Sequence, residues 1–329
     1  MKHIAVIGAG SIGRRHIDNL RLLHAKTQIY WLGATGQLPP ALRLNDIQYP
    51  ASLEELTALP LDYAVVASPA SSHQQHLSAL LAHNIPVLVE KPLAATLAQG
   101  LQLQKLCQAS PQIPVAVAYC LRFLPALPLL KTQLAEQLIG TVLHVNCHVA
   151  QYLPDWRPGK DYRQSVSGQT ALGGGVLLEL SHELDYLYYL FGPLKLLHSK
   201  LQQSGLLDID VEDQADLLLS APEAGTICLH LDFLQKTVQR RCVISGTEGR
   251  LEWDLVQNTI VLYQAKQQKL IFSDENYPKN QMYLQMLQQF ELMVQNPQQQ
   301  PAFLASIDDA VSTLRVIDEA KRQSQFKEN

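Results

Sequence analysis

Residues 4–13 read IAVIGAGSIG, and this stretch decides the fold of the first part of the chain. Its first four residues are apolar and predict a buried strand, and its glycines have the spacing GxGxxG. In such a strand–turn–helix unit, Gly8 permits a tight turn, Gly10 lets a pyrophosphate approach the backbone, and Gly13 lets the helix pack on the strand. Amides at a helix N-terminus bind anions. We therefore predict that a dinucleotide binds at Gly8, Gly10, Ser11, Ile12 and Gly13.

The remainder of the first third alternates short β-branched runs with amphipathic stretches, which is the pattern of βαβ units. Strands are expected at residues 4–7, 28–32, 63–67, 87–90 and 115–118. Helices are expected at residues 12–24 and 72–83, and from Thr96, where Thr96-Leu97-Ala98-Gln99 has the form of a capping box. These elements predict an α/β fold class with an N-terminal Rossmann domain, built on a doubly wound parallel sheet.

The alternation stops near residue 121, and a second sheet is predicted beyond it. Its strands are expected at residues 141–149, 215–219, 226–233, 241–245, 250–253 and 259–263, and one helix is expected at 176–190. The turn Gly246-Thr247-Glu248-Gly249 joins two strands as a hairpin, so this sheet should be large, open and mainly antiparallel. We expect a dinucleotide-binding Rossmann domain at 1–121, a C-terminal α/β domain for substrate binding and oligomerisation at 122–305, and a C-terminal helix at 306–329 that packs back toward the first domain.

The strand at 28–32 lacks the acidic residue that commonly holds the ribose 2′-hydroxyl of NAD. Without that carboxylate the site does not repel a 2′-phosphate, which Arg14 and Thr35 could accept. The sequence therefore leaves NAD and NADP equally open as the cofactor.

Two further segments carry groups suited to acid–base chemistry. Glu90-Lys91-Pro92 follows the fourth strand, at the edge where ligands of doubly wound folds bind. Gly173-Gly174-Gly175 precedes the expected helix, on which Glu179, His182 and Asp185 are three residues apart and share one face. A histidine between two carboxylates can be oriented as a general base. Taken singly, each segment is also compatible with a solvated surface.

Residues 151–170 form a long loop of the length that is usually functional or disordered. Within it, Trp156 and Tyr162 offer apolar faces for a sugar ring, and Arg157 and Arg163 offer guanidinium groups for a carboxylate or phosphate. An anionic sugar would suit this set. The alternative is a loop fixed to its own domain by a buried Trp and a salt bridge.

The chain resembles the Gfo/Idh/MocA oxidoreductase family over nearly its whole length. The resemblance rests on the order of three motifs, which are GxGxxG, then Glu-Lys-Pro, then GGG followed by HxxD. Ala67-Ser68-Pro69 with His73, and Arg122-Phe123, are further matches. The resemblance implies a Rossmann domain, an open α/β domain whose sheet often forms the oligomer interface, and Lys91 and His182 around a sugar or cyclitol carbon that gives or takes a hydride.

The same resemblance implies a cis Lys91–Pro92 bond. It assigns the nicotinamide half of the cofactor site to Ser68, Pro69, His73, Glu90 and Lys91, and it adds Tyr119 and Arg122 to the substrate site. Many members have an aspartate four residues before the histidine, where this chain has Leu178. Whether Glu179 takes that role stays open, so the catalytic set is Lys91, His182, Asp185 and Glu179.

These inferences predict an NAD(P)-dependent dehydrogenase or reductase that acts on a CH–OH group of a sugar, amino sugar or sugar derivative. The segment at 152–163 resembles a subgroup associated with surface-sugar or sialic-acid-type biosynthesis. Two alternatives stay open. One is a non-catalytic dinucleotide-binding sensor with the same fold, and the other is a family member that uses its cofactor transiently for elimination or glycoside cleavage.

Composition excludes other partners. The 329 residues carry a net charge of -4, which leaves no basic excess for nucleic acid. The apolar runs are far shorter than the roughly 18 to 20 residues that span a bilayer. We expect a cytoplasmic protein, because no export signal precedes the first strand and the five cysteines have no CxxC spacing.

Two expectations concern the second sheet. His144 and His148 share a strand face, but no third ligand is near them in sequence, so no metal site is expected. Ile227, Leu229 and Leu231 alternate with polar residues, and an apolar sheet face needs a cover. We therefore predict a homodimer or homotetramer that forms through this sheet.

Overall fold

The computed structural model describes residues 1–298, 301 and 303–324. The chain forms two compact units. The first comprises Met1–Phe123 and Asn280–Val311, and the second comprises Leu124–Lys279 and the residues from Ser312 onward. No helix of the described residues is long and apolar enough to cross a bilayer.

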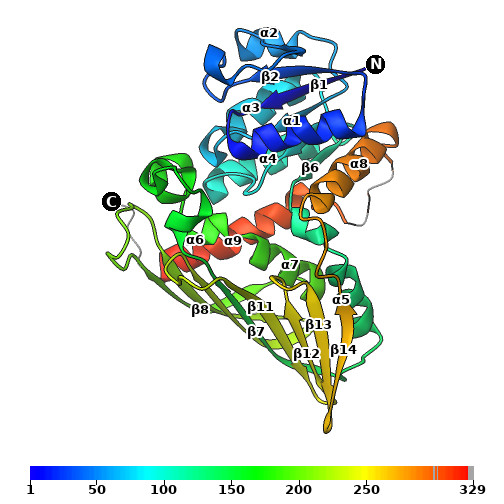
Figure 1. Cartoon of the computed structure of the whole chain (residues 1–329), viewed down its shortest axis with the longest axis vertical. Coiled ribbons are helices and arrows are strands. Elements are labelled where there is room, and N and C mark those ends of the chain that lie inside the picture. The colour runs from blue at the N-terminus through cyan, green and yellow to red at the C-terminus, as the bar shows by residue number, and fades with distance from the viewer. Residues whose placement is uncertain (299–300, 302, 325–329) are drawn as a thin grey trace. The chain divides into compact units, whose positions relative to one another are not determined.

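The first unit contains a six-stranded parallel sheet in the order β3-β2-β1-β4-β5-β6 (Figure 1). Helix α1 packs beside α8, and α3 packs beside α4. The elements are β1 (Lys2–Ile7), α1 (Ser11–Leu23), β2 (Thr27–Leu32), β3 (Ile47–Gln48), α2 (Leu53–Thr57), β4 (Tyr63–Val66), α3 (His73–Ala82), β5 (Val87–Val89), α4 (Leu97–Ala109), β6 (Val115–Val117) and α8 (Gln281–Gln295).

The central strands of this sheet are apolar throughout because helices cover both faces. Ile4, Val6 and Val65 are fully buried. The predicted cap of α4 is present, since the amide of Gln99 donates to Oγ1 of Thr96 at 3.3 Å. The prediction of a doubly wound parallel sheet is confirmed.

Helix α8 belongs to the first unit, although the sequence-based division put residues 122–305 together. Its Met286, Leu287 and Phe290 are fully buried in the same core cluster as β1 and β4. Glu291 of α8 also accepts a hydrogen bond from the Tyr63 hydroxyl at 2.8 Å. Apolar packing therefore joins a late segment of the chain to the N-terminal sheet.

The second unit contains an eight-stranded sheet in the order β14-β13-β12-β11-β7-β10-β9-β8. Only β7 and β10 pair in parallel among these neighbours, which confirms the prediction of a mainly antiparallel sheet. The elements are α5 (Ala126–Ala135), β7 (Val142–Ala150), α6 (Val176–Glu179), α7 (His182–Phe191), β8 (Lys195–Gln202), β9 (Gln214–Ala221), β10 (Ala224–Asp232), β11 (Gln239–Gly246), β12 (Arg250–Asp254), β13 (Thr259–Gln264), β14 (Gln267–Ser273) and the part of α9 (Ile307–Gln323) from Ser312 onward. The first residues of α9, up to Val311, belong to the first unit.

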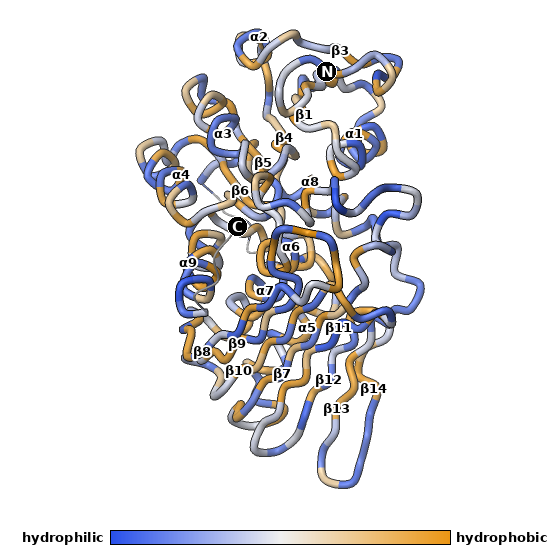
Figure 2. The backbone as a smooth tube through the Cα atoms, turned by 90° about the vertical axis from the view of Figure 1, so that its left-hand side faces the viewer, coloured by the Kyte–Doolittle hydropathy of each residue, from blue (hydrophilic) through white to orange (hydrophobic). Residues whose placement is uncertain are grey.

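The two faces of this sheet differ in polarity, and Figure 2 shows the alternation along its strands. Ile227, Leu229 and Leu231 are at most 1% exposed. On the same face Trp253 meets Tyr186 of α7, with ring centroids 5.2 Å apart. The chain's own helices thus cover the apolar face on which we based the oligomer prediction, and the opposite face is the polar one.

Candidate functional site

The glycines of the GxGxxG turn meet different surroundings. Gly8 has φ +124°, and a Cβ there would lie 2.2 Å from the carbonyl oxygen of Ala67. A Cβ on Gly13 would lie 2.3 Å from the carbonyl oxygen of Gly8. Gly10 has φ -75°, which any residue adopts, and a Cβ there would meet nothing within 4 Å. The fold therefore requires glycine at positions 8 and 13, whereas glycine at position 10 leaves open space beside the turn.

The open space lies at the start of α1. Gly10 is the N-cap residue, so no side chain occupies the first amides, and the first turn holds no acidic residue. The exposed Ser11 follows directly. Trp31 fixes the turn to β2, since its indole Nε1 donates to the carbonyl oxygen of Gly8 at 2.8 Å. An uncapped helix N-terminus with room beside it suits a phosphate group.

The two residues expected to accept a 2′-phosphate are both exposed. Thr35 follows the end of β2, whereas Arg14 donates from Nε to both carboxylate oxygens of Asp18 at 3.1 Å, one turn along α1. An exposed pair of this kind contributes little stability and can be exchanged for a ligand. The choice between NAD and NADP therefore stays open.

At the carboxyl end of β4, Ser68 and His73 are both buried. The ring nitrogens of His73 lie 2.8 Å from the carbonyl oxygen of Ser68 and 3.2 Å from that of Leu93. His76 bridges Oγ of Ser68 at 2.9 Å and the carbonyl oxygen of Ala34 at 3.1 Å. Burial lowers the pKa of His73 and lowers the pKa of His76 to about 4. His73 thus joins the β4 end to the loop after Pro92 and is only 1% exposed to any ligand.

Glu90 and Lys91 follow β5 at the same carboxyl edge of the sheet. Oε1 of Glu90 lies 2.8 Å from Nε2 of the fully buried His16, and Oε2 accepts the Lys91 amide at 3.2 Å. Lys91 is half-buried, and the Lys91–Pro92 bond is cis, as predicted. Sequence reasoning missed His16. Its helical spacing from Gly13 places both residues on the buried face of α1, and this spacing could have indicated that His16 is buried.

Tyr119 and Arg122, which the sequence assigned to the substrate site, are 1% and 3% exposed. Nη1 of Arg122 lies 3.0 Å from Oδ2 of Asp309 in the first turn of α9. The guanidinium therefore has a carboxylate partner inside the first unit, because a buried charge is costly without one. The structure does not present these two side chains to solvent.

In the second unit the last glycine of the triplet packs against Glu212. A Cβ on Gly175, which has φ +108°, would lie 2.4 Å from Oε1 of Glu212. That oxygen accepts the amide of Leu177 at 3.2 Å, and Nζ of Lys321 lies 3.8 Å from Oε2. Glu212 is fully buried. Its carboxylate therefore occupies the start of α6 and holds the turn that leads to His182.

The prediction of one helix over residues 176–190 is wrong at Leu180. Helix α6 ends at Glu179, Leu180 has φ -98° and ψ 25°, and α7 begins at His182. Ser181 accepts the amide of Asp185 at its carbonyl oxygen, at 3.0 Å, so a new helix starts there. Glu179 and His182 are half-buried and Asp185 is buried. The three residues therefore do not lie on one continuous helix.

Sequence reasoning also missed an ion pair next to this segment. Glu183 is fully buried, and its Oε1 lies 2.7 Å from both Nε and Nη2 of Arg240 on β11. The two residues are 57 positions apart, and no local pattern links them. The pair ties the first turn of α7 to the sheet below it.

The loop at 153–167 encloses a cavity of about 420 Å³. Its lining includes Trp156, Tyr162 and the exposed cations Arg157 and Lys160. The Trp156 ring meets Phe233 edge-on at 5.2 Å. The sequence named three of these four residues and missed Lys160.

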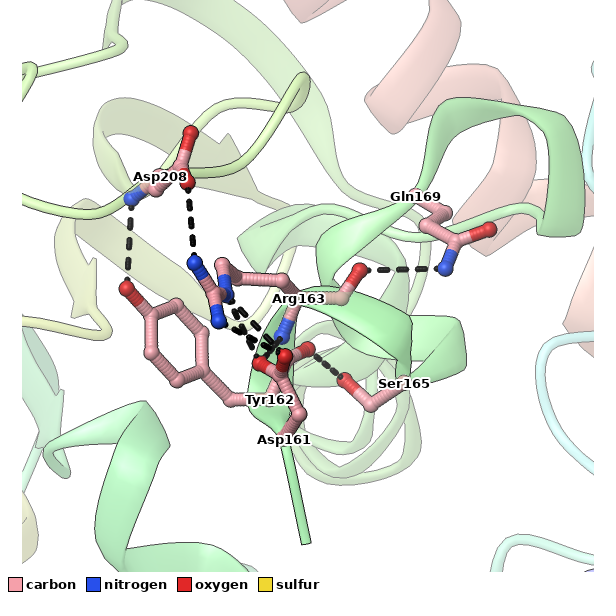
Figure 3. Close-up of polar contacts among 6 residues, drawn as sticks. All are labelled: Asp161, Tyr162, Arg163, Ser165, Gln169 and Asp208. Atoms are coloured by element: carbon pink, nitrogen blue, oxygen red, sulfur yellow. Dashed lines mark hydrogen bonds and ion pairs between the residues drawn. The ribbon is translucent and has the colours of Figure 1, made fainter.

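Arg163 faces carboxylates of its own domain (Figure 3). Its Nε and Nη2 donate to Asp161 at 2.8–3.1 Å, and Nη1 donates to Asp208 at 3.4 Å. The Tyr162 hydroxyl accepts the amide of Asp208 at 3.3 Å. Hydrogen bonds from Arg163 lower the pKa of Asp161. These contacts fit the alternative of a loop fixed to its own domain, and they leave Arg157 and Lys160 as the cations of the cavity.

Comparison with known proteins matches both parts of the chain to one family. Residues 2–119 match its domain described as "Oxidoreductase family, NAD-binding Rossmann fold", and residues 129–252 match "GFO/IDH/MocA C-terminal domain". The rhizopine catabolism protein MocA of Rhizobium meliloti is 24% identical over 57% of this chain and 57% of its own length. An inositol 2-dehydrogenase of Acidothermus cellulolyticus is 30% identical over 57% of this chain and 53% of its own.

The chain thus spans about half the length of the curated relatives it matches. Among solved structures, an inositol dehydrogenase homologue from Azotobacter vinelandii complexed with NAD+ superposes with a TM-score of 0.83. It covers 100% of this chain and 96% of its own at 16% identity, which shows a shared fold. Both domain matches and the resemblance of motifs agree: the chain belongs to the Gfo/Idh/MocA family of oxidoreductases, and its N-terminal part is that family's NAD-binding Rossmann domain.

Proposed function

We propose that this protein is an NAD(P)-dependent oxidoreductase that transfers a hydride between the nicotinamide and a CH–OH carbon of a sugar, cyclitol or amino-sugar derivative. The observation that carries the proposal is the open, uncapped turn at Gly10, on the carboxyl edge of the sheet from which Lys91 also emerges. Family membership supports it, because the curated relatives named above include an inositol 2-dehydrogenase.

The cofactor would be held by the turn at the start of α1. The amides at Gly10, Ser11 and Ile12 would bind its pyrophosphate, because helix N-terminal amides carry partial positive charge. Ser68, Pro69, Glu90 and Lys91 would line its nicotinamide half, with His73 acting from behind as the support that holds two loops together. When bound, the nicotinamide supplies the acceptor or donor of the hydride.

Lys91 and His182 would move the proton that accompanies hydride transfer. A hydroxyl that loses hydride from its carbon must also lose its proton, and a neutral imidazole is suited to accept it. We assign His182 as the base in the oxidation direction and Lys91, when charged, as the donor that stabilises the alkoxide oxygen. The exchanged assignment, with Lys91 as base, stays open. Asp185 and Glu179 would orient the histidine.

The cations of the loop cavity suggest an anionic substrate. Arg157 and Lys160 are exposed and line the cavity together with Trp156 and Tyr162. A guanidinium and an ammonium beside aromatic rings suit a sugar that carries a carboxylate or phosphate. An acidic or nucleotide-linked sugar of surface-polysaccharide or sialic-acid-type metabolism would have this chemistry.

Turnover assays test the proposal. The purified protein would be mixed with NAD+ or NADP+ and a panel that contains myo-inositol, neutral hexoses, hexuronic acids and nucleotide sugars, and the reduced cofactor would be followed by its absorbance. We expect reduction with at least one member and tighter binding of anionic than of neutral sugars. Failure to bind either dinucleotide would refute the proposal. Dinucleotide binding without turnover on any sugar would favour the sensor alternative.

We keep the expectation of a homodimer or homotetramer on the family resemblance alone, because the apolar sheet face that we first gave as its ground is covered by the chain's own helices. Multi-angle light scattering over a range of protein concentrations measures the molar mass directly. A mass that stays at 36.7 kDa at every concentration would contradict the prediction.

A further inference from the structure

Two histidines and a carboxylate meet on the polar face of the large sheet. Strands β7 and β10 pair in parallel, and their register places His148 directly beside His230. The two imidazole rings have centroids 4.7 Å apart. Asp232 lies two residues after His230 on the same face, and one ligand atom from each of the three residues lies within 4.8 Å of the other two.

The surrounding contacts orient this group. Nδ1 of His230 lies 2.6 Å from Oδ1 of Asp216 on β9, and Nε2 lies 3.0 Å from Oδ2 of Asp232. Oδ1 of Asp232 accepts the amides of Leu234 and Gln235 at 2.7 and 2.8 Å. The second oxygen of Asp232 and the Nε2 of His230 thus face each other from side chains that are already held in place.

This pattern matches the chemistry of protein zinc sites. A histidine that binds metal through one nitrogen usually donates its other N–H to a carboxylate or carbonyl, as Nδ1 of His230 can donate to Asp216. Zn²⁺ is bound by imidazole nitrogen at about 2.0–2.1 Å and by carboxylate oxygen at about 2.0–2.2 Å. Donor atoms around a tetrahedral ion at those bond lengths lie about 3.4 Å apart. Ligand atoms that lie within 4.8 Å of one another would therefore have to approach by up to about 1.4 Å.

We propose that His148, His230 and Asp232 form a binding site for a divalent transition-metal ion, with Zn²⁺ the best fit. His148 and His230 supply imidazole nitrogens, Asp232 supplies one carboxylate oxygen, and Asp216 orients His230 from behind. Three protein ligands leave one position of a tetrahedral ion to water. The site lies on the polar face of the sheet, and none of its three ligands belongs to the proposed catalytic set of Lys91, His182, Asp185 and Glu179.

The competing occupant of the same site is a proton. Without metal, an imidazolium at His230 would donate to Asp216 and to Asp232, and these two partners raise the pKa of His230. His148 faces it from β7, and Arg241 lies beside His148 on β11 but is paired with Asp254 at 3.1 Å. A metal ion at this site would take the place of the proton on Nε2 of His230.

Calorimetric titration of the untagged, EDTA-treated full-length protein with ZnCl₂ tests the site. We expect one Zn²⁺ per chain, with affinity lowered at least tenfold in His148→Ala and in Asp232→Asn, and lowered about 10- to 100-fold in Asp216→Asn, the change that removes only the orienting carboxylate. His144→Ala is the matched control, since it removes the histidine four residues before His148 on the same face of β7. Its affinity should equal that of the wild type.

Titration with Co²⁺ gives a second readout, because a four-coordinate site with nitrogen ligands produces visible absorption bands that these ligand variants would lose. Urea unfolding of each metal-free variant shows whether it is folded before metal is added. If a ligand variant does not fold, the loss of zinc affinity in Asp216→Asn still tests the site, because that change leaves all three ligands in place. Three results would overturn the proposal: no zinc binding by the wild type, equal binding by wild type and His148→Ala, or one zinc per two chains with dimerisation.

Discussion

Gly10→Val is predicted to separate cofactor binding from folding. A Cβ at Gly10 meets nothing within 4 Å, and the residue has φ -75° and ψ 177°, which is extended backbone that valine adopts readily. The variant should therefore lose only the modest advantage of glycine at an N-cap. We expect the free energy of unfolding to fall by at most about 1 kcal/mol.

The effect on the dinucleotide should be much larger. A hydrogen bond to a charged group contributes about 1.5–3 kcal/mol. If the valine side chain keeps the pyrophosphate away from two amides of the turn, the loss is about 3–6 kcal/mol. Because 1.4 kcal/mol corresponds to a factor of ten, Kd should rise about 10²- to 10⁴-fold.

Calorimetric titration with NADH and NADPH measures Kd, and urea unfolding measures stability in the same preparations. Gly13→Ala is the contrasting variant, since its Cβ would lie 2.3 Å from the carbonyl oxygen of Gly8 and should destabilise the fold itself. If Gly10→Val binds both dinucleotides as tightly as the wild type does, the assignment of the α1 turn as the pyrophosphate site is refuted.

Three further predictions address catalysis, packing and pH. Lys91→Ala and His182→Ala should each lower kcat by at least about 10²-fold, dinucleotide affinity should stay unchanged in His182→Ala, and near wild-type turnover in both would contradict their assigned roles. Glu183→Ala should lower the free energy of unfolding by about 3 kcal/mol in urea titrations, because it breaks a charge pair in which Glu183 is fully buried, and a loss under 1 kcal/mol would count against a structural role for the pair. Burial lowers the pKa of His76 to about 4. In the unfolded chain this histidine is protonated below about pH 6.5, whereas in the folded chain it stays neutral down to about pH 4. Stability should therefore decrease as the pH falls from about 6.5 to 4, by up to about 1.4 kcal/mol per unit from this residue, and His76→Gln should remove that part of the slope.

Several features of the fold could be predicted from sequence because they depend on neighbouring residues. The GxGxxG turn, the cap of α4 by Thr96 and the alternating segments of the second sheet are local patterns, with periods of 3.6 or 2 residues. Two elements were missed for different reasons. The strand β3 at Ile47–Gln48 has only two residues and leaves no pattern, whereas the 15-residue helix α8 at Gln281–Gln295 has apolar residues at helical spacing that the sequence analysis overlooked.

The candidate site was predicted unevenly for a related reason. Sequence reasoning named residues by their chemistry, but it could not give their burial. Arg122 and Arg163 were both expected to face a ligand, yet Arg122 is paired with Asp309 and Arg163 with Asp161. Asp309 lies in α9, and Asp161 lies two residues before Arg163 in the loop. Only the folded chain decides which carboxylate each guanidinium contacts.

By itself the sequence determined the fold class, the family and the position of the dinucleotide turn, because each is written in residues that are close together along the chain. Tertiary structure decided which residues that are far apart in sequence lie together in space. The pairing of His148 with His230 depends on the parallel register of β7 and β10, strands separated by about 80 residues, and no local spacing encodes it. Register is set by which faces of the strands are buried, and that choice is made only when the whole sheet packs against its helices.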